Sequence, residues 1–393
     1  MRRFVFLSLL TLAACAGPAG QQQPARTADG RFTIVRQVPI SSVKNQHKSG
    51  TCWDFATLGF FEAELLRETG REYDLCEMFV VSKDYMDNAE HYVRMHGFSQ
   101  ISQGGSCDDV LEVIRNYGIC PEEAMAAPGA LVGDSLANFN VFFPELERTV
   151  QRVILENASL NVFTAAEQTL AKAKEPQKHW QDSVQAVIDK YLGPVPETFF
   201  FEGKSYTPRS FAESLPLNPD DYVSITSFTH HPFNQWFVIE APYKWRLKPS
   251  YNIPVGELMD VLDAALDAGY TVAWGGDVSG DFDRKTAIAE LPEALPWGTA
   301  SDGRSDSGQS AAVQQMRQEQ WDDWRFTYDH VMLVYGRAED AVGTVYYLVK
   351  NSWGTGTPYA GTWMMSRDYL ALNTTYLFLN RHALPQPLRR AVK

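Results

Sequence analysis

The fold is decided by one short stretch, which reads Gln46-His47-Lys48-Ser49-Gly50-Thr51-Cys52-Trp53. An apolar run, WDFATLGFFEAELL over residues 53–66, follows it and predicts a buried helix. A cysteine just before a helix meets the positive end of the helix dipole and unbonded backbone amides, which lower the pKa of its thiol from about 8.5. Because a thiolate attacks carbonyl carbon readily, Cys52 is a candidate nucleophile. Gln46 is a candidate donor to the oxyanion that such an attack creates.

Two downstream segments contain the groups that such a thiol needs. Tyr328-Asp329-His330-Val331-Met332 opens an apolar strand, which places His330 at the strand's edge. Lys350-Asn351-Ser352-Trp353-Gly354 follows the next predicted strand. An imidazole beside the thiol takes its proton, forms a thiolate–imidazolium pair and later protonates a leaving amine. We expect Asn351 to orient the imidazole ring and Trp353 to cover the hydrogen bond between them.

In this order the segments resemble the papain-like cysteine peptidases, whose motifs read Gln-x-x-x-Gly-x-Cys-Trp, Asp-His-x-Met and Lys-Asn-Ser-Trp-Gly. The resemblance implies that Cys52 is the nucleophile and His330 the general base and acid. It implies that Asn351 is the orienting residue and Gln46 the oxyanion donor. The implied reaction is hydrolysis of a peptide bond through an acyl-enzyme thioester, with no metal and no cofactor.

The family also binds the substrate backbone with a Gly-Gly pair that lies between its first two helices. Gly104-Gly105 stands in the equivalent place in this sequence, where an ordinary turn is the alternative interpretation. Gly104, Gly105 and Trp353 are therefore the candidate substrate-binding residues.

The spacing of the motifs departs from that of papain itself. Cys52 and His330 are 278 residues apart, against about 130–150 in the papain and cathepsin set. The extra residues predict a helical insertion at about 125–250. An insertion of this size resembles the bleomycin hydrolase and aminopeptidase C branch of the family. Two short segments resemble the same branch: Tyr117-Gly118-Ile119-Cys120-Pro121 and Gly276-Asp277-Val278-Ser279. That branch trims single residues from peptide N-termini.

Several alternatives to N-terminal trimming stay open. In the branch a C-terminal tail blocks one side of the cleft, whereas this sequence stops at Lys393, soon after its last predicted strand. Endopeptidase action, a cell-wall amidase or transpeptidase on the same fold, and an inactive peptide-binding scaffold are the alternatives. The sequence leaves the side-chain specificity and the oligomeric state open.

The order of predicted elements indicates an α+β fold, because helices come first and strands later. The resemblance implies a papain-like two-subdomain fold, helical on the left and β-rich on the right, over residues 31–393. We expect helices at 53–66, 108–117, 254–268 and, as two or three pieces, 143–192. We expect strands at 32–35, 270–274, 331–335, 345–350, 362–365 and 376–379, and a polar loop at 301–310.

The N-terminus predicts export. Residues 1–15 place two arginines before a short apolar run and small residues, which is the order of a secretory signal peptide. Leu12-Ala13-Ala14-Cys15 resembles the lipobox of bacterial lipoproteins, which implies cleavage before Cys15 and lipid on its thiol. Residues 16–30 are typical of a flexible tether. We therefore expect an exported protein, lipid-anchored at the bacterial cell envelope; an ordinary cleaved signal with an incidental cysteine is the alternative.

The composition excludes several classes of protein. Of 393 residues, 45% are hydrophobic and 21% charged, so the chain is neither disordered nor a multi-span membrane protein. A net charge of −13 argues against a nucleic-acid partner. We expect a peptide substrate, and membrane contact only through the N-terminal lipid.

Two smaller features complete the sequence interpretation. The pairing of Cys76, Cys107 and Cys120 stays open, although Cys107 and Cys120 flank a predicted helix and are expected to be too far apart. His230-His231 has no carboxylate or cysteine at ligand spacing, so we expect a polar loop and no metal.

Overall fold

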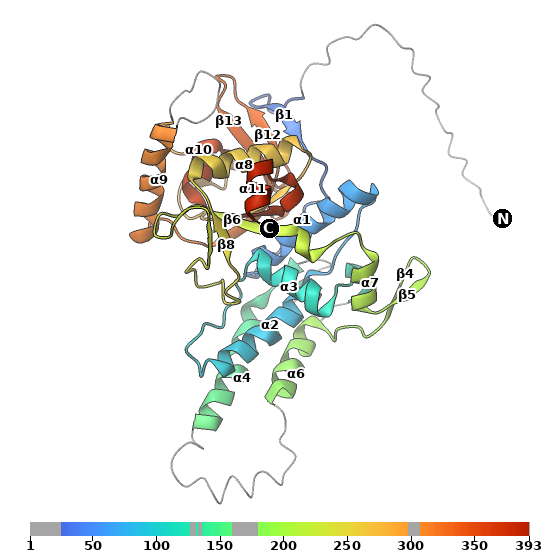
Figure 1. Ribbon diagram of the computed structural model, residues 1–393. Helices are drawn as coiled ribbons and strands as arrows, with labels where there is room; N and C mark the ends of the chain where they lie inside the picture. The colour runs from blue at the N-terminus through green and yellow to red at the C-terminus, as the bar shows by residue number, and fades with distance from the viewer. Residues whose placement is uncertain (1–24, 126–130, 133–135, 159–179, 298–306, 393) are drawn as a thin grey trace, which may run out of the picture.

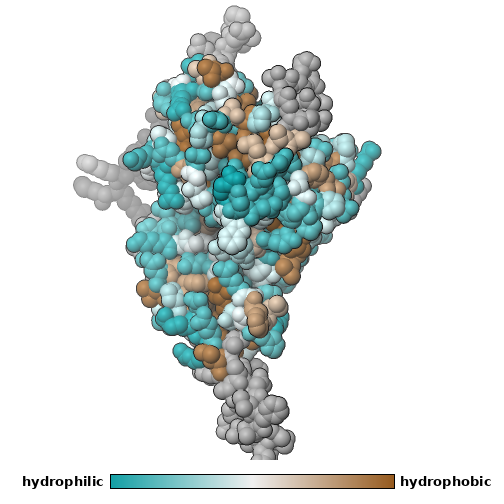
Figure 2. Space-filling model, turned by 90° about the vertical axis from the view of Figure 1, so that its left-hand side faces the viewer, coloured by the Kyte–Doolittle hydropathy of each residue, from teal (hydrophilic) through white to brown (hydrophobic). Residues whose placement is uncertain are grey.

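The computed structural model describes residues 25–125, 131–132, 136–158, 180–297 and 307–392. One part of the molecule is helical, and the other is built on an eleven-stranded mixed sheet (Figure 1). The predicted signal peptide and most of the predicted tether lie outside the described residues. On the face shown in Figure 2, apolar residues form small groups among hydrophilic ones. Within the described ranges, no helix is both long and apolar enough to cross a membrane.

The helical part contains most of the described residues from the N-terminal half of the chain. Its helices are α1 (Cys52–Thr69), α2 (Glu77–Arg94), α3 (Cys107–Tyr117), α4 (Phe139–Ala158), α6 (Trp180–Leu192) and α7 (Pro208–Ser214). Two short hairpins accompany them, β2 (Leu131–Val132) with β3 (Leu136–Ala137) and β4 (Phe199–Phe201) with β5 (Lys204–Tyr206). Helices α2, α4 and α6 pack together at the end of the molecule away from β12 and β13 (Figure 1).

Helix α1 lies between the two parts. It contacts α2 and α3 as well as two strands of the large sheet. Its first fourteen residues, Cys52–Leu65, are all buried, which confirms the helix predicted from an apolar run without a polar face.

The β-rich part follows in the chain. Its strands, in the order of the sheet, are β10 (Phe282–Asp283), β11 (Ile288–Ala289), β14 (Thr362–Ser366), β13 (Val345–Lys350), β12 (His330–Glu339), β9 (Val272–Gly276), β15 (Thr374–Asn380), β6 (Tyr222–Thr226), β8 (Ser250–Asn252) and β7 (Gln235–Phe237). Strand β1 (Thr33–Gln37) pairs with the second half of β12. Helices α8 (Val255–Asp267), α9 (Ser307–Asp322), α10 (Arg367–Asn373) and α11 (Gln386–Ala391) belong to this part.

The register of β12 positions two of the predicted site residues. His330 opens this strand and pairs with Gly276 of β9. Strand β13 runs antiparallel to β12 and ends at Lys350, which pairs with Leu333. Because the start of one strand meets the end of its antiparallel neighbour, Asn351 follows directly beside His330.

The α+β fold class is confirmed, and most predicted elements occur within a few residues of their expected bounds. Two differences stand out. Residues 307–310, predicted as loop, begin α9, while residues 301–306 lie outside the described part. The segment 125–250, predicted as a helical insertion, also contains β6 and β7 of the main sheet. These strands are short. β6 is held by pairing with β15, a strand more than a hundred residues later, and β7 by pairing with β8.

Candidate active site

A cleft of about 680 Å³ brings the predicted site residues together. Its walls come from the segment before α1, the loop 100–105 before α3, the segment 328–331 at the start of β12, and Trp353. Cys52 is the first residue of α1 and is only 9% exposed. Because the first amides of a helix have no partner within it, the Cys52 backbone N–H is free to act in the cleft.

The surroundings of Cys52 act on the pKa of its thiol in opposite directions. Burial raises the pKa of the Cys52 thiol to about 12, and the nearby Asp329 carboxylate also raises it. Backbone N–H groups of Val331, Trp53 and Cys52 itself lower this pKa, because they stabilise the thiolate. The contact with the Val331 N–H places the sulfur against β12, the strand that His330 opens.

The His330 imidazole is held by an amide. Its Nε2–H donates to Asn351 Oδ1 at 2.9 Å, and the same oxygen accepts the Ser352 backbone N–H at 2.8 Å. An oxygen can only accept, so this bond assigns the proton to Nε2 and leaves Nδ1 to receive a proton from the thiol. The Trp353 ring covers the imidazole at a centroid distance of 4.9 Å. Burial lowers the pKa of His330 to about 4.

Burial therefore opposes the thiolate and the imidazolium when each forms alone. Transfer of the proton from Cys52 to His330 creates both charges at once, and their attraction is strong in a site with little water. The backbone amides and the α1 dipole stabilise the same state. The thiolate–imidazolium pair depends on this coupled transfer and stays a prediction.

Gln46 is fixed by two hydrogen bonds. Its Oε1 accepts the Ser352 hydroxyl at 2.5 Å, and its Nε2 donates to the Ser49 carbonyl at 2.8 Å. An amide nitrogen carries two hydrogens, so one N–H of Gln46 is left for a ligand in the cleft. The arrangement suits the predicted oxyanion donor.

Gly104 and Gly105 both line the cleft, as predicted. A Cβ on Gly105 would lie 2.8 Å from the Trp53 ring, and one on Gly104 would lie 2.7 Å from the Tyr243 ring. The Tyr328 hydroxyl donates to the Gly105 carbonyl at 2.6 Å. Close packing alone therefore requires glycine at both positions, and their role toward substrate stays a prediction.

Sequence reasoning missed several residues that shape the cleft. The Gln103 side chain accepts the Gly50 N–H at 2.8 Å, and its backbone carbonyl accepts the Trp53 indole N–H at 2.9 Å. Asp329 accepts the Val278 N–H at 3.0 Å, and burial raises the pKa of its carboxyl to about 6. Asp329 is itself the first residue of the Asp-His-x-Met motif, but sequence reasoning assigned it no role in the cleft. Gln103 belongs to no such motif.

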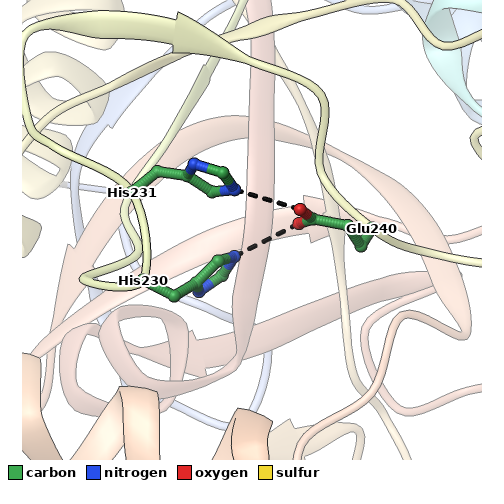
Figure 3. A group of neighbouring side chains, drawn as sticks. All are labelled: His230, His231 and Glu240. Carbon is green, nitrogen blue, oxygen red and sulfur yellow. Dashed lines mark hydrogen bonds and ion pairs between the residues drawn. The ribbon is translucent and has the colours of Figure 1, made fainter.

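The structure corrects the interpretation of His230-His231 (Figure 3). Glu240 lies against both rings, with its carboxylate 3.3 Å from His230 Nε2 and 3.0 Å from His231 Nε2. The carboxylate that was missing from the sequence pattern is thus supplied nine and ten residues downstream. These three side chains bring their ligand atoms within 4.8 Å of one another, a donor set that suits a divalent metal.

The neighbouring Gln318 amide determines which ring nitrogen of His230 carries the proton. Gln318 Oε1 accepts the Thr229 N–H at 2.7 Å, and its Nε2 donates to Asp322 at 2.9 Å. The same Nε2 therefore donates to His230 Nδ1 at 2.9 Å, which places the imidazole proton on Nε2, facing Glu240. A metal ion would need a lone pair at that nitrogen. These bonds favour a hydrogen-bonded His–Glu cluster over a metal centre.

The fold and the cleft together define a papain-like cysteine peptidase. The chain belongs to the Peptidase C1-like family, whose model matches residues 77–393, including His330 and Asn351.

Named relatives align over most of the chain. Aminopeptidase C of Listeria monocytogenes is 22% identical over 95% of this chain and 88% of its own length. Aminopeptidase W of Lactobacillus delbrueckii subsp. lactis is 22% identical over 97% and 89%. The crystal structure of PepW from Lactobacillus rhamnosis superposes with a TM-score of 0.70 at 19% identity, over 92% of this chain and 84% of that one. At this identity the superposition shows the fold.

Proposed function

We propose that this protein is a cysteine aminopeptidase with Cys52 as nucleophile. The observation that carries the proposal is that Gln46 and Cys52 line one cleft with His330, which is 278 residues after Cys52, while Asn351 holds the His330 ring. Retention of all four groups argues against an inactive scaffold, because peptide binding alone does not need them.

The reaction follows from these positions. Cys52 Sγ passes its proton to His330 Nδ1 and attacks the scissile carbonyl carbon. The Cys52 backbone N–H and the free Gln46 N–H stabilise the oxyanion. His330 then protonates the leaving amine, which produces a thioester. Water, deprotonated by His330, hydrolyses the thioester and restores the thiol.

Two observations support action at the amino end of peptides. Several relatives are named aminopeptidases. Asp329 is the one carboxyl group among the described residues that line the cleft. A free α-amino group is positively charged, so this carboxylate favours a peptide whose N-terminus lies beside Asp329 and away from Lys48, the cation of the same lining.

Paired peptides test the proposal. One peptide has a free N-terminus, and its partner has the same sequence with an N-acetyl group. Mass spectrometry of the products is expected to show stepwise loss of single N-terminal residues, at least about tenfold faster from the free peptide. Cys52→Ala is expected to lower turnover by about 10³-fold or more.

Other products would identify the alternatives. Internal fragments from the acetylated peptide would indicate an endopeptidase, and turnover of cell-wall peptides alone would indicate an amidase or transpeptidase. Full activity of Cys52→Ala would refute the role of Cys52. No turnover of any peptide, with no labelling of Cys52 by a thiol probe, would indicate a scaffold.

We also propose that the protein is exported and anchored at the cell envelope by lipid on Cys15. The sequence pattern of residues 1–15 supports this proposal. When the full chain from a bacterial host is partitioned between a detergent phase and an aqueous phase, we expect it in the detergent phase. The Cys15→Ser variant is expected in the aqueous phase. Recovery of the unsubstituted protein in the aqueous phase, with no acyl group on Cys15, would refute the anchor.

A further inference from the structure

Two buried cysteines of the helical part lie opposite each other. Leu75 and Pro121 form an antiparallel bridge, and the Cys76 N–H donates to the Cys120 carbonyl at 3.0 Å. Cys76 and Cys120 are therefore the next pair along this bridge and make one of the two backbone bonds of a hydrogen-bonded pair, for which Cα atoms lie about 5.5 Å apart. This separation falls within the range of about 4.4–6.8 Å that disulfides require. The Cys120 thiol also raises the pKa of Cys76, which places the two side chains near each other.

The other described cysteines have different neighbours. Cys107 begins α3, whereas Cys120 follows the end of that helix, so the whole length of α3 lies between these two residues. The Tyr376 hydroxyl donates to the Cys107 sulfur at 3.5 Å. Cys52 faces the cleft. Among the described cysteines, Cys76 and Cys120 form the one pair that is placed for bonding.

The surroundings of this pair favour bond formation before the chain is fully folded. Both residues are 0% exposed, and the Glu122 carboxyl group lies near Cys76. The Cys120 thiol, burial and the Glu122 charge raise the pKa of Cys76 well above its usual range. Thiol–disulfide exchange needs an attacking thiolate that can reach the bond. A disulfide formed here during folding is therefore reduced slowly once the helical part has folded and buried both sulfurs.

We propose that Cys76 and Cys120 form a structural disulfide in the exported protein. Each thiol gives up one hydrogen, and the sulfurs join. The two electrons and two protons pass to a disulfide oxidant, a protein disulfide or glutathione disulfide, which is reduced to two thiols. The proposal rests on the proposed export only for the source of this oxidant.

The bond would join two elements that support the cleft. Cys76 is the N-cap of α2, and Cys120 follows α3, whose other end carries Gly104-Gly105. The closed segment 76–120 thus contains one wall of the active-site cleft. We expect the disulfide to stabilise this wall without taking part in the reaction.

Peptide mapping tests the bond directly. The full chain is equilibrated with glutathione disulfide during refolding, denatured in N-ethylmaleimide without reductant and digested with trypsin. The expected product is a linked pair of peptides, 72–83 with 116–148. Cys107→Ser is the matched control and is expected to retain the linked pair, whereas Cys76→Ser is expected to lose it. Separate, alkylated peptides in the unsubstituted protein would overturn the proposal.

A thermal measurement tests the consequence. The oxidised protein is expected to melt about 5 °C above protein refolded with reductant, and a Cys76→Ala/Cys120→Ala variant is expected to show no such difference. Equal melting temperatures would refute a stabilising role. Neither readout requires peptide turnover, so this proposal and the proposed peptidase activity fail independently.

Discussion

Ser352 connects two of the residues that we propose to be catalytic. Its hydroxyl donates to Gln46 Oε1, and its backbone N–H donates to Asn351 Oδ1. One residue thus orients both the oxyanion donor and the group that holds the imidazole. Its position directly after Asn351 makes this possible, because β13 has just ended and the chain turns toward the cleft.

Substitution of Ser352 tests this positioning role. Ser352→Ala removes the bond to Gln46 but keeps the backbone bond to Asn351. We expect kcat to fall about tenfold with KM unchanged, because a loosely held donor stabilises the transition state less. The double variant with Gln46→Ala is expected to be no slower than Gln46→Ala alone. Additive losses in peptide kinetics would show that Ser352 acts by another route.

The Asp329 charge predicts a pH dependence of thiol reactivity. Asp329, whose pKa is about 6, becomes negative as the pH rises through this value, and its charge raises the pKa of the Cys52 thiol. Ionisation of Asp329 therefore opposes the thiolate above pH 6. In Asp329→Asn we expect iodoacetamide to alkylate Cys52 about threefold faster at pH 7–8. The inflection near pH 6 in the rate profile should vanish, and identical profiles would contradict this assignment.

At the scale of elements, α3 ends where only glycine fits. Gly118 has φ +85° and ψ −156°, a conformation that is accessible almost only to glycine. A Cβ there would lie 2.2 Å from the Pro208 carbonyl oxygen at the start of α7. The tight approach of α7 to the end of α3 depends on this residue.

Gly118→Ala is accordingly expected to lower the free energy of unfolding by about 3 kcal/mol, from backbone strain and the clash with α7 together. Gly203→Ala is the control, because Gly203 has φ +78° but open space around its Cβ position. This control should lose only about 1 kcal/mol. Urea denaturation measures both variants, and equal losses would mean that the contact with α7 is unimportant.

At the scale of the whole molecule, one buried arginine ties α9 to the sheet. The Arg317 guanidinium donates to the Ser227 carbonyl after β6, to the Ala371 and Leu372 carbonyls of α10, and to the Thr374 carbonyl of β15. Burial lowers the pKa of Arg317 to about 9. The chain thus satisfies four carbonyl groups with one side chain.

Arg317→Met is expected to lower the free energy of unfolding by about 3 kcal/mol, because these carbonyl groups lose their donors inside the protein. Gln315→Met, on the exposed side of α9, is the matched control and should change stability by less than about 0.5 kcal/mol. Denaturant midpoints followed by circular dichroism measure the difference. An unchanged midpoint for Arg317→Met would show that water replaces the guanidinium.

The sequence by itself determined the features that depend on neighbours along the chain. The buried helix after Cys52 and the strand that opens with His330 are local patterns, and the structure has both of them. The motif residues also identified the family, because their chemistry needs particular residue types in a particular order.

Only the tertiary structure decided the contacts between distant residues. Gln46 and Ser352 are separated by 306 positions, and no periodicity relates them. The same holds for β6 beside β15. Local propensity acts over a few residues, whereas these contacts exist because burial of the core brings separate elements together in one packed arrangement.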